Sequence, residues 1–208
     1  MRSNAPDLAR LSLVGAAILL LSLLAGCTRE PPEVREVRRA TQDYFHALQR
    51  QDLKQIADRS TCLVSARYLS GARILSIEGL RTVRAGAVDS LARAEALAQR
   101  TADSTWTRAT DDAKVDSLSR VARTHSFRAS VYRCAERAIQ LSAPRAIVSS
   151  DSTLETRYVR ARFRYAGPAI GTRATDRETI VRLLRAPGGK WIVFSVYSKE
   201  DDPAPEML

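Results

Sequence analysis

The side chains best suited to covalent or metal chemistry are few: the sequence has three cysteines and two histidines. Besides Cys27, the thiols are those of Cys62 and Cys134, and no histidine or acid stands directly beside either. No spacing typical of a zinc site, a redox pair, a serine hydrolase or a phosphate-binding loop occurs. We therefore expect no metal and no cofactor.

The most unusual charge pattern is a row of three arginines at alternate positions, Arg160, Arg162 and Arg164. In a strand these side chains lie on one face, where like charges repel unless something compensates them. One interpretation is an anion-binding site for a lipid headgroup, an acidic glycan or an acidic partner protein. The other is a solvated outer face, or pairing with acids such as Glu155 and Glu178. We favour the second, because a row of charges is usually solvated.

The N-terminal segment has the pattern of a targeting signal. Arg2 and Arg10 flank the start of an apolar run, residues 11–24, which is shorter than the roughly 20 residues of a membrane span. The run ends in Leu-Ala-Gly-Cys at residues 24–27, which resembles the bacterial lipobox. The resemblance implies cleavage before Cys27 and acylation of that cysteine, as with palmitate. Because Thr28 follows instead of aspartate, it also implies an outer-membrane position facing the periplasm. The alternatives are an ordinary secretory signal and a transmembrane anchor.

An exported location affects the interpretation of the two remaining thiols. Such compartments permit disulfides, and Cys62 and Cys134 are the pair that is left once Cys27 is acylated. A bridge would close a long loop and stabilise the fold by up to ~4 kcal/mol. However, Cys134 lies three residues after Val131 and four before Ala138, on the apolar face of an expected helix. The alternative is therefore two separate buried thiols.

Length and composition indicate one folded domain. The 208 residues carry 33 basic and 23 acidic side chains, and 45% are hydrophobic, which excludes a disordered chain. Without residues 1–26, the remaining 182 residues are enough to bury a core. We expect a tether over 27–33, one domain over 34–198 and a frayed tail over 199–208. Nucleic acid is not an expected partner of an exported protein, despite the positive charge.

The first part of this domain has the periodicity of helices. A stripe at spacings of three and four predicts a helix that ends at Arg50; its members are Val34, Val37, Thr41, Tyr44 and Leu48. Asp52 is expected to cap a second helix, with Gln55 three residues later. Residues 60–80 are expected to continue as helix. Further helices are predicted over 81–100, 111–124 and 126–141, with a loop over 101–110 and His125 between two helices.

The last part of the domain changes to the period of strands. Strands are predicted over 145–149, 154–165, 179–186 and 190–198, with a turn at residues 187–189. In the second strand, Val159, Ala161 and Phe163 alternate with the three arginines and so lie on the opposite face. The order of elements predicts an α+β fold with N-terminal helices and a C-terminal curved antiparallel sheet of about four strands.

Two stretches resemble the nuclear transport factor two-like superfamily, whose domain is an α+β cone. The first is the opening helix pair, with Tyr44-Phe45, Ala47-Leu48 and Asp52-Leu53. The second is the C-terminal sheet, with the alternating strand over 154–165 and a Gly-rich turn before Trp191. Many small bacterial lipoproteins carry this domain. The departure is a helical insertion near residues 81–124, which we expect to form a hairpin.

The resemblance implies where ligands or reactants would lie. Enzymes of the superfamily place acids, histidine or tyrosine inside the cone, and the matching residues here are Asp43, Tyr44, His46 and Tyr158. Asp176 and Glu178 lie at a strand start and are weaker candidates. A carrier of small apolar ligands would line the cone interior with Tyr44, Tyr158 or Trp191. Family analogy also implies a homodimer through the sheet.

These observations favour a binding role over catalysis. We expect a lipid-anchored module of the cell envelope that binds the membrane through its lipid and contacts an envelope protein or an anionic headgroup. The alternatives are a carrier of a small apolar ligand and an isomerase- or hydratase-like enzyme in the cone. An enzyme would need a buried acid with a raised pKa, and no spacing in the sequence marks one.

Overall fold

The computed structural model describes residues 30–62, 64, 68–107, 112–145, 147–167 and 171–198. The predicted signal, Cys27, most of the tether and the tail over 199–208 lie outside the described residues. The chain divides into two units, residues 1–35 and 36–208. The described helices are α2 (Pro32–Arg50), α3 (Leu53–Arg59), α4 (Ala85–Trp106) and α5 (Asp112–Ser142). The described strands are β1 (Leu69–Ile77), β2 (Arg81–Arg84), β3 (Thr153–Gly167), β4 (Gly171–Arg185) and β5 (Ile192–Ser198).

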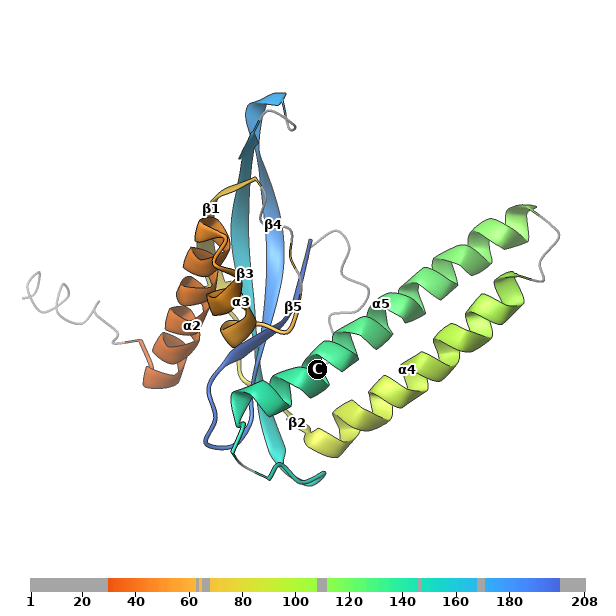
Figure 1. The fold of residues 1–208 in the computed structure, drawn as a ribbon, viewed down its shortest axis with the longest axis horizontal. Helices are drawn as coiled ribbons and strands as arrows, with labels where there is room; N and C mark the ends of the chain where they lie inside the picture. Colours follow the sequence, from red (N-terminus) through yellow and green to blue (C-terminus); the bar gives the residue numbers. More distant parts are fainter. Residues whose placement is uncertain are drawn as a thin grey trace, which may run out of the picture. The chain divides into compact units, whose positions relative to one another are not determined.

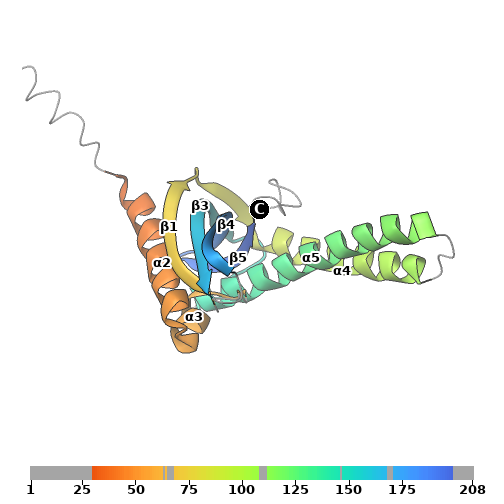
Figure 2. The ribbon, with the colours of Figure 1, turned by 90° about the horizontal axis from the view of Figure 1, so that it is seen from above.

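The fold is α+β, as the sequence predicts. Among the described residues, five strands form one antiparallel sheet in the order β1-β3-β4-β5, and β2 also pairs with β3 (Figure 1). From residue 36 onward α2 lies on one face of the sheet, and α5 with α4 lies on the other (Figure 2). The central strands β3 and β4 are therefore covered on both faces over part of their length.

The face under α2 is filled by packed side chains. Tyr44, Phe45 and Leu48 of α2 pack against Phe163 of β3 and Leu183 of β4, and all five are buried. The rings of Phe45 and Phe163 meet edge to face at 5.1 Å, a favourable geometry for aromatic pairs. This part of the sheet interior is a close-packed core.

The opposite face is covered by the base of a helical hairpin, which is formed by α4 and α5. Val88 and Ala92 of α4 join Val131 and Ala135 of α5 in a cluster that includes Phe194 of β5. Small alanines in this seam let the two helices approach closely. The hairpin extends away from the sheet (Figure 1), and three of its larger apolar side chains are exposed. These are Leu97 (61%), Trp106 (42%) and Val121 (46%).

The helical prediction for residues 60–80 is wrong, because most of the described part of this stretch is β1. Its partner is β3, from Leu69 opposite Tyr165 to Ile77 opposite Val159. Two register shifts interrupt the alternation of apolar residues in β1, so the strand period is weak in the sequence. Residues 81–84 are also strand, β2, and the helix predicted to begin at residue 81 begins at Ala85.

The predicted breaks in the hairpin are also wrong. Helix α4 continues to Trp106, through most of the predicted loop, and a single helix α5 spans the two helices predicted on either side of His125. His125 is therefore a helix residue, not a loop residue. Its Nδ1 lies 2.7 Å from Oε2 of Glu95 on α4, and both side chains are largely buried. This contact joins α5 to α4 at a weak helix-forming sequence.

The predictions for the C-terminal strands agree better with the structure. The described residues between 145 and 149 form no strand, and β4 begins at Gly171, well before residue 179. The predicted alternation in β3 is confirmed: Val159, Ala161 and Phe163 are fully buried, and the three arginines lie on the other face. The Asp52 cap is confirmed as well, since its Oδ1 accepts a hydrogen bond of 3.0 Å from the Gln55 amide.

The β4–β5 turn fits closely against the end of α5. Gly188 has φ +67°, the left-handed region that favours glycine. Gly189 has an ordinary φ, but a Cβ there would lie 2.5 Å from Ser142 Oγ and 2.6 Å from the Ser142 carbonyl oxygen. Glycine at 189 is therefore required by close approach and not by backbone conformation.

We expect Gly189→Ala to destabilise the protein by about 2 kcal/mol, since the backbone of Ser142 must move to admit the methyl group. Gly79→Ala is the matched control, because a Cβ at Gly79 meets no atom within 4 Å. The measurement is urea unfolding followed by circular dichroism. Equal midpoints for the two variants would contradict the packing described for this turn.

Candidate functional site

The candidate site is a cleft of about 370 Å³ where α2, α3 and the β4–β5 turn meet. Its lining combines four basic side chains, three acidic ones and an apolar floor. The basic residues are Arg39, Arg59, Arg185 and Lys190; the acidic ones are Glu36, Asp43 and Asp58; Ala40, Gly189 and Trp191 complete the lining. A concave site with apolar floor and converging polar groups is the usual form of a ligand site.

One wall of the cleft is a stripe on α2. Glu36, Arg39, Ala40 and Asp43 are spaced three and four residues apart, so they lie on one side of the helix. The opposite side of α2 buries Val37, Tyr44 and Leu48 against the sheet. The core contacts of α2 therefore fix the direction in which this charged stripe points.

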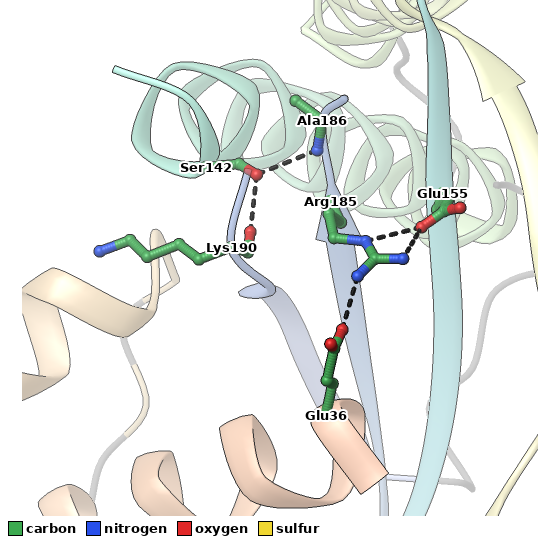
Figure 3. Close-up of polar contacts among 6 residues, drawn as sticks. All are labelled: Glu36, Ser142, Glu155, Arg185, Ala186 and Lys190. Atoms are coloured by element: carbon green, nitrogen blue, oxygen red, sulfur yellow. Dashed lines mark hydrogen bonds and ion pairs between the residues drawn. The ribbon is translucent and has the colours of Figure 1, made fainter. Parts of the chain in front are cut away.

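Arg185 joins three elements at the inner edge of the cleft (Figure 3). Its guanidinium contacts Glu36 of α2 at 2.6 Å and Glu155 of β3 at 2.7 Å. It also lies over the ring of Trp191, 4.7 Å from the centroid, in a cation–π arrangement. Because both of its carboxylate contacts are made within the protein, we assign Arg185 a structural role.

A second set of contacts holds the turn that forms another wall of the cleft (Figure 3). Ser142 Oγ accepts from the Ala186 amide at 2.9 Å and donates to the Lys190 carbonyl at 2.6 Å. The side chain of Lys190 reaches α3, where Nζ donates to the carbonyl oxygen of Asp58 at 2.9 Å. The turn is thus tied to both α5 and α3.

Two charged groups of the cleft have no ion-pair or hydrogen-bond partner for their side chains among the described residues. These are the guanidinium of Arg39 on α2 and the carboxylate of Asp58 on α3. Asp43, in contrast, pairs with Arg59 at 3.4 Å. The indole N–H of Trp191 is buried and also has no hydrogen-bond partner in the described part of the chain. Buried donors are normally satisfied, so this unpaired N–H is an exception among the described residues.

The predicted pocket of Tyr44, Tyr158 and Trp191 is not one pocket. Tyr44 and Trp191 belong to the cluster under α2, whereas Tyr158 packs on the opposite face of the sheet with Ile180, Tyr197 and Phe127. Tyr44 is fully buried, and burial raises the pKa of its hydroxyl far above the usual value. Of the three, Trp191 alone lines the cleft described here.

The residues considered for proton transfer are dispersed as well. Asp43 lies in the cleft, but His46 is exposed on α2 and lines a separate cavity of about 300 Å³ beside β1. Glu178 and Asp176 contact arginines of β3. No two of these candidates form a contact that the structure describes, so they do not form a shared acid–base site.

The arginine row is largely compensated by acids of the neighbouring strand. Arg160 Nε donates to Glu178 Oε1 at 2.8 Å, and Arg164 lies 3.9 Å from Asp176. Arg162 has no such contact among the described residues. This arrangement agrees with the structural interpretation that we favoured, with one difference: Glu155 pairs with Arg185 and not with the row.

The two described cysteines, Cys62 and Cys134, are free thiols in this structure. Burial is the largest cause that raises the pKa of each, to about 11 for Cys62. Neither is therefore an activated nucleophile, since the thiolate is the reactive form.

A second cavity, of about 470 Å³, lies at the base of the helical hairpin and is lined by Asp89 and Glu136 among others. Burial, followed by the charge of Asp89, raises the pKa of Glu136. Asp89 already pairs with Arg93.

In the described ranges we find no group of three or more metal-ligating side chains. None of the described helices has the length and apolar character needed to cross a membrane.

Sequence reasoning identified Trp191 and Asp43 but missed Arg39, Asp58 and Lys190. The α2 stripe could have been found from the sequence, since its charges repeat with the helical period. The lining from the β4–β5 turn is far from α2 and α3 in the sequence, and only the fold brings it to these helices. Comparison with protein families, with curated proteins and with solved structures found no match to this chain.

Proposed function

We propose that this protein is a lipid-anchored, non-catalytic binding module of the cell envelope, and that the cleft between α2, α3 and the β4–β5 turn is its binding site. The observation that carries the proposal is the pair of unpartnered charges, Arg39 and Asp58, on two different walls of one cleft. The Leu-Ala-Gly-Cys motif supports the anchor and an outer-membrane position facing the periplasm.

The charges define the chemistry of the ligand. Arg39 suits a carboxylate, which a guanidinium binds in a fork geometry, and Asp58 suits an ammonium group. Ala40 and Trp191 add apolar surface to the lining of the cleft. A peptide segment of a partner protein with neighbouring acidic and basic side chains combines these features.

The lining argues for binding and against turnover. Neither a histidine nor a cysteine is among the residues that line the cleft. The carrier alternative needs space inside the sheet, but Tyr44, Phe45 and Phe163 fill the face under α2. The isomerase-like alternative needs acid–base groups in one pocket, and its candidate residues are dispersed. These observations favour the binding module over the other two hypotheses.

The test is isothermal titration with two capped tripeptides, Glu-Leu-Lys and its uncharged counterpart Gln-Leu-Gln. We expect Glu-Leu-Lys to bind and Gln-Leu-Gln to bind at least about tenfold more weakly, a difference of about 1.4 kcal/mol. Arg39→Glu should lower the affinity for the charged peptide by a similar factor, because it replaces attraction for the peptide carboxylate by repulsion.

Lys54→Glu is the matched control. It makes the same change in net charge from an exposed position on α3 that does not line the cleft. If Lys54→Glu weakens binding as much as Arg39→Glu does, the effect is one of overall charge and the cleft is not the site.

A further inference from the structure

The segment that follows α3 and the middle of α5 are joined by two reciprocal contacts. Thr61 Oγ1 donates to the Cys134 carbonyl oxygen at 2.7 Å, and Cys134 Sγ donates to the Thr61 carbonyl oxygen at 3.4 Å. Cys62 is the next residue along the chain. The fold therefore brings two cysteines about 70 positions apart to adjoining backbone segments.

The position of this segment is fixed by the edge of the sheet. Ser60 forms a parallel bridge with Val193 of β5, and the Thr61 amide donates to the Val193 carbonyl at 3.0 Å. Cys62 then turns back, with its sulfur 3.1 Å from Ser60 Oγ. The two cysteines thus adjoin at a place that β5 holds in register.

The two cysteines belong to the clusters on the two faces of the sheet, so a bridge between them would pass around the edge strand β5. Cys62 packs against the cluster under α2, and Cys134 packs against the cluster under the helical hairpin. Burial is the largest cause that raises the pKa of Cys62, and the hydrogen bond from Ser60 lowers it. The charge of Cys134 is the next cause, and it raises the pKa of Cys62.

We propose that Cys62 and Cys134 are a disulfide-forming pair, whose oxidation ties the segment after α3 to α5 and so locks the base of the helical hairpin onto the sheet. One thiolate attacks the disulfide of a small or protein thiol oxidant, such as oxidised glutathione, and one thiol of the oxidant leaves. The second cysteine thiolate then attacks the mixed disulfide. The Cys62–Cys134 bond forms, and the oxidant takes up both electrons and the two cysteine protons as two thiols.

Burial predicts slow formation of this bond at neutral pH. Since the pKa of both thiols is raised, only a small fraction of either is thiolate at pH 7. The rate of oxidation should therefore rise by about tenfold per pH unit between pH 7 and pH 9, while the thiolate fraction grows. Exposed thiols of ordinary pKa would show a shallower dependence at the upper end of this range.

The test uses the full chain with Cys27→Ser, so that Cys62 and Cys134 are the two thiols present. The protein is incubated with oxidised glutathione, denatured, alkylated with iodoacetamide and weighed intact. We expect the unalkylated chain at a mass lowered by two hydrogen atoms, a digest peptide that joins residues 62 and 134, and a raised thermal unfolding midpoint.

Adding Cys134→Ser or Cys62→Ser to that background gives the matched controls, and each should take up one glutathione or one alkyl group. The proposal is overturned if the two-cysteine chain instead keeps both thiols alkylatable, carries glutathione without an internal bridge, or forms only intermolecular dimers. Circular dichroism of each variant separates these outcomes from misfolding.

Discussion

Replacing Cys27 by serine will abolish attachment of fatty acid to this protein. The prediction follows from the N-terminal sequence, in which a basic leader and an apolar run of residues 11–24 end in Leu-Ala-Gly-Cys. The resemblance of this motif to the lipobox implies that acylation requires the cysteine sulfur. Serine cannot supply it, so the effect is complete loss and not a graded one.

The measurement is metabolic labelling with an alkyne analogue of palmitate, followed by coupling to a fluorophore and gel electrophoresis. The wild-type chain should carry the label, and Cys27→Ser should carry none. Cys134→Ser is the matched control and should keep full labelling. A labelled Cys27→Ser protein would mean that another residue is acylated, and an unlabelled wild type would favour a secretory signal or an uncleaved anchor.

Such an anchor matters for the proposed function because it determines how the protein is held. Each buried methylene contributes about 0.8 kcal/mol, and a single acyl chain gives only reversible membrane binding. A lipoprotein with more than one chain stays at the membrane. The cleft would then sample partners at high effective concentration, which makes a modest affinity sufficient.

The second large effect is expected at Arg182, which we predict to be essential for stability. Arg182 is 2% exposed and lies between the rings of Tyr158 and Tyr197, at 5.0 and 4.9 Å from their centroids. Arg81 covers the same Tyr158 ring at 4.7 Å, and Phe127 of α5 meets the Tyr197 ring edge to face. An alternating stack of arginines and tyrosines therefore crosses β2, β3, β4 and β5.

We expect Arg182→Ala to lower the free energy of unfolding by about 3 kcal/mol, through loss of two desolvated cation–π contacts and formation of a cavity. Arg182→Met retains most of the volume without the charge, so it should recover part of this loss. Urea unfolding measures both changes.

Arg162→Ala is the control, because Arg162 lies on the same face of the sheet but is partly exposed and has no partner among the described residues. It should change stability by less than about 0.5 kcal/mol. An Arg182→Ala variant as stable as Arg162→Ala would mean that the stack contributes nothing to folding.

The sequence predicted the parts of the fold whose signal is local. The alternation over 154–165 identifies β3, since burial on one face imposes a period of two on consecutive residues. The Asp52 cap is equally local. Strand β1 was missed because its apolar pattern is interrupted by register shifts, and its stability comes from pairing with β3, far along the chain. Tertiary pairing overrides a weak local pattern in such cases.

His125 illustrates the same limit in a helix. The sequence Thr-His-Ser at 124–126 has low helix propensity and reads as a break between two helices. In the structure α5 continues through these residues, and His125 contacts Glu95 of α4, an interaction that no local sequence pattern reveals. The resemblance to the nuclear transport factor two-like superfamily agrees with the α+β fold and stays a prediction.

The cleft was the least predictable feature. Its lining comes from α2, from the end of α3 and from both sides of the β4–β5 turn, and the turn lies far from the two helices in the sequence. Lys190 and Asp58 have ordinary surface character in the sequence. Their importance arises from the fit of the turn against α5 and α3, which Ser142 and Gly189 make possible.

The most direct test of the proposed binding site uses the two tryptophans of the chain, Trp106 and Trp191. Trp191 lines the cleft, and Trp106 lies at the end of α4. In a nitrogen-15 correlation spectrum of the purified protein, each indole N–H gives its own resonance. On addition of the capped Glu-Leu-Lys peptide, we predict that the Trp191 indole resonance shifts while that of Trp106 stays in place. A shift of Trp106 alone, or of neither resonance at saturating peptide, would contradict a binding site in this cleft.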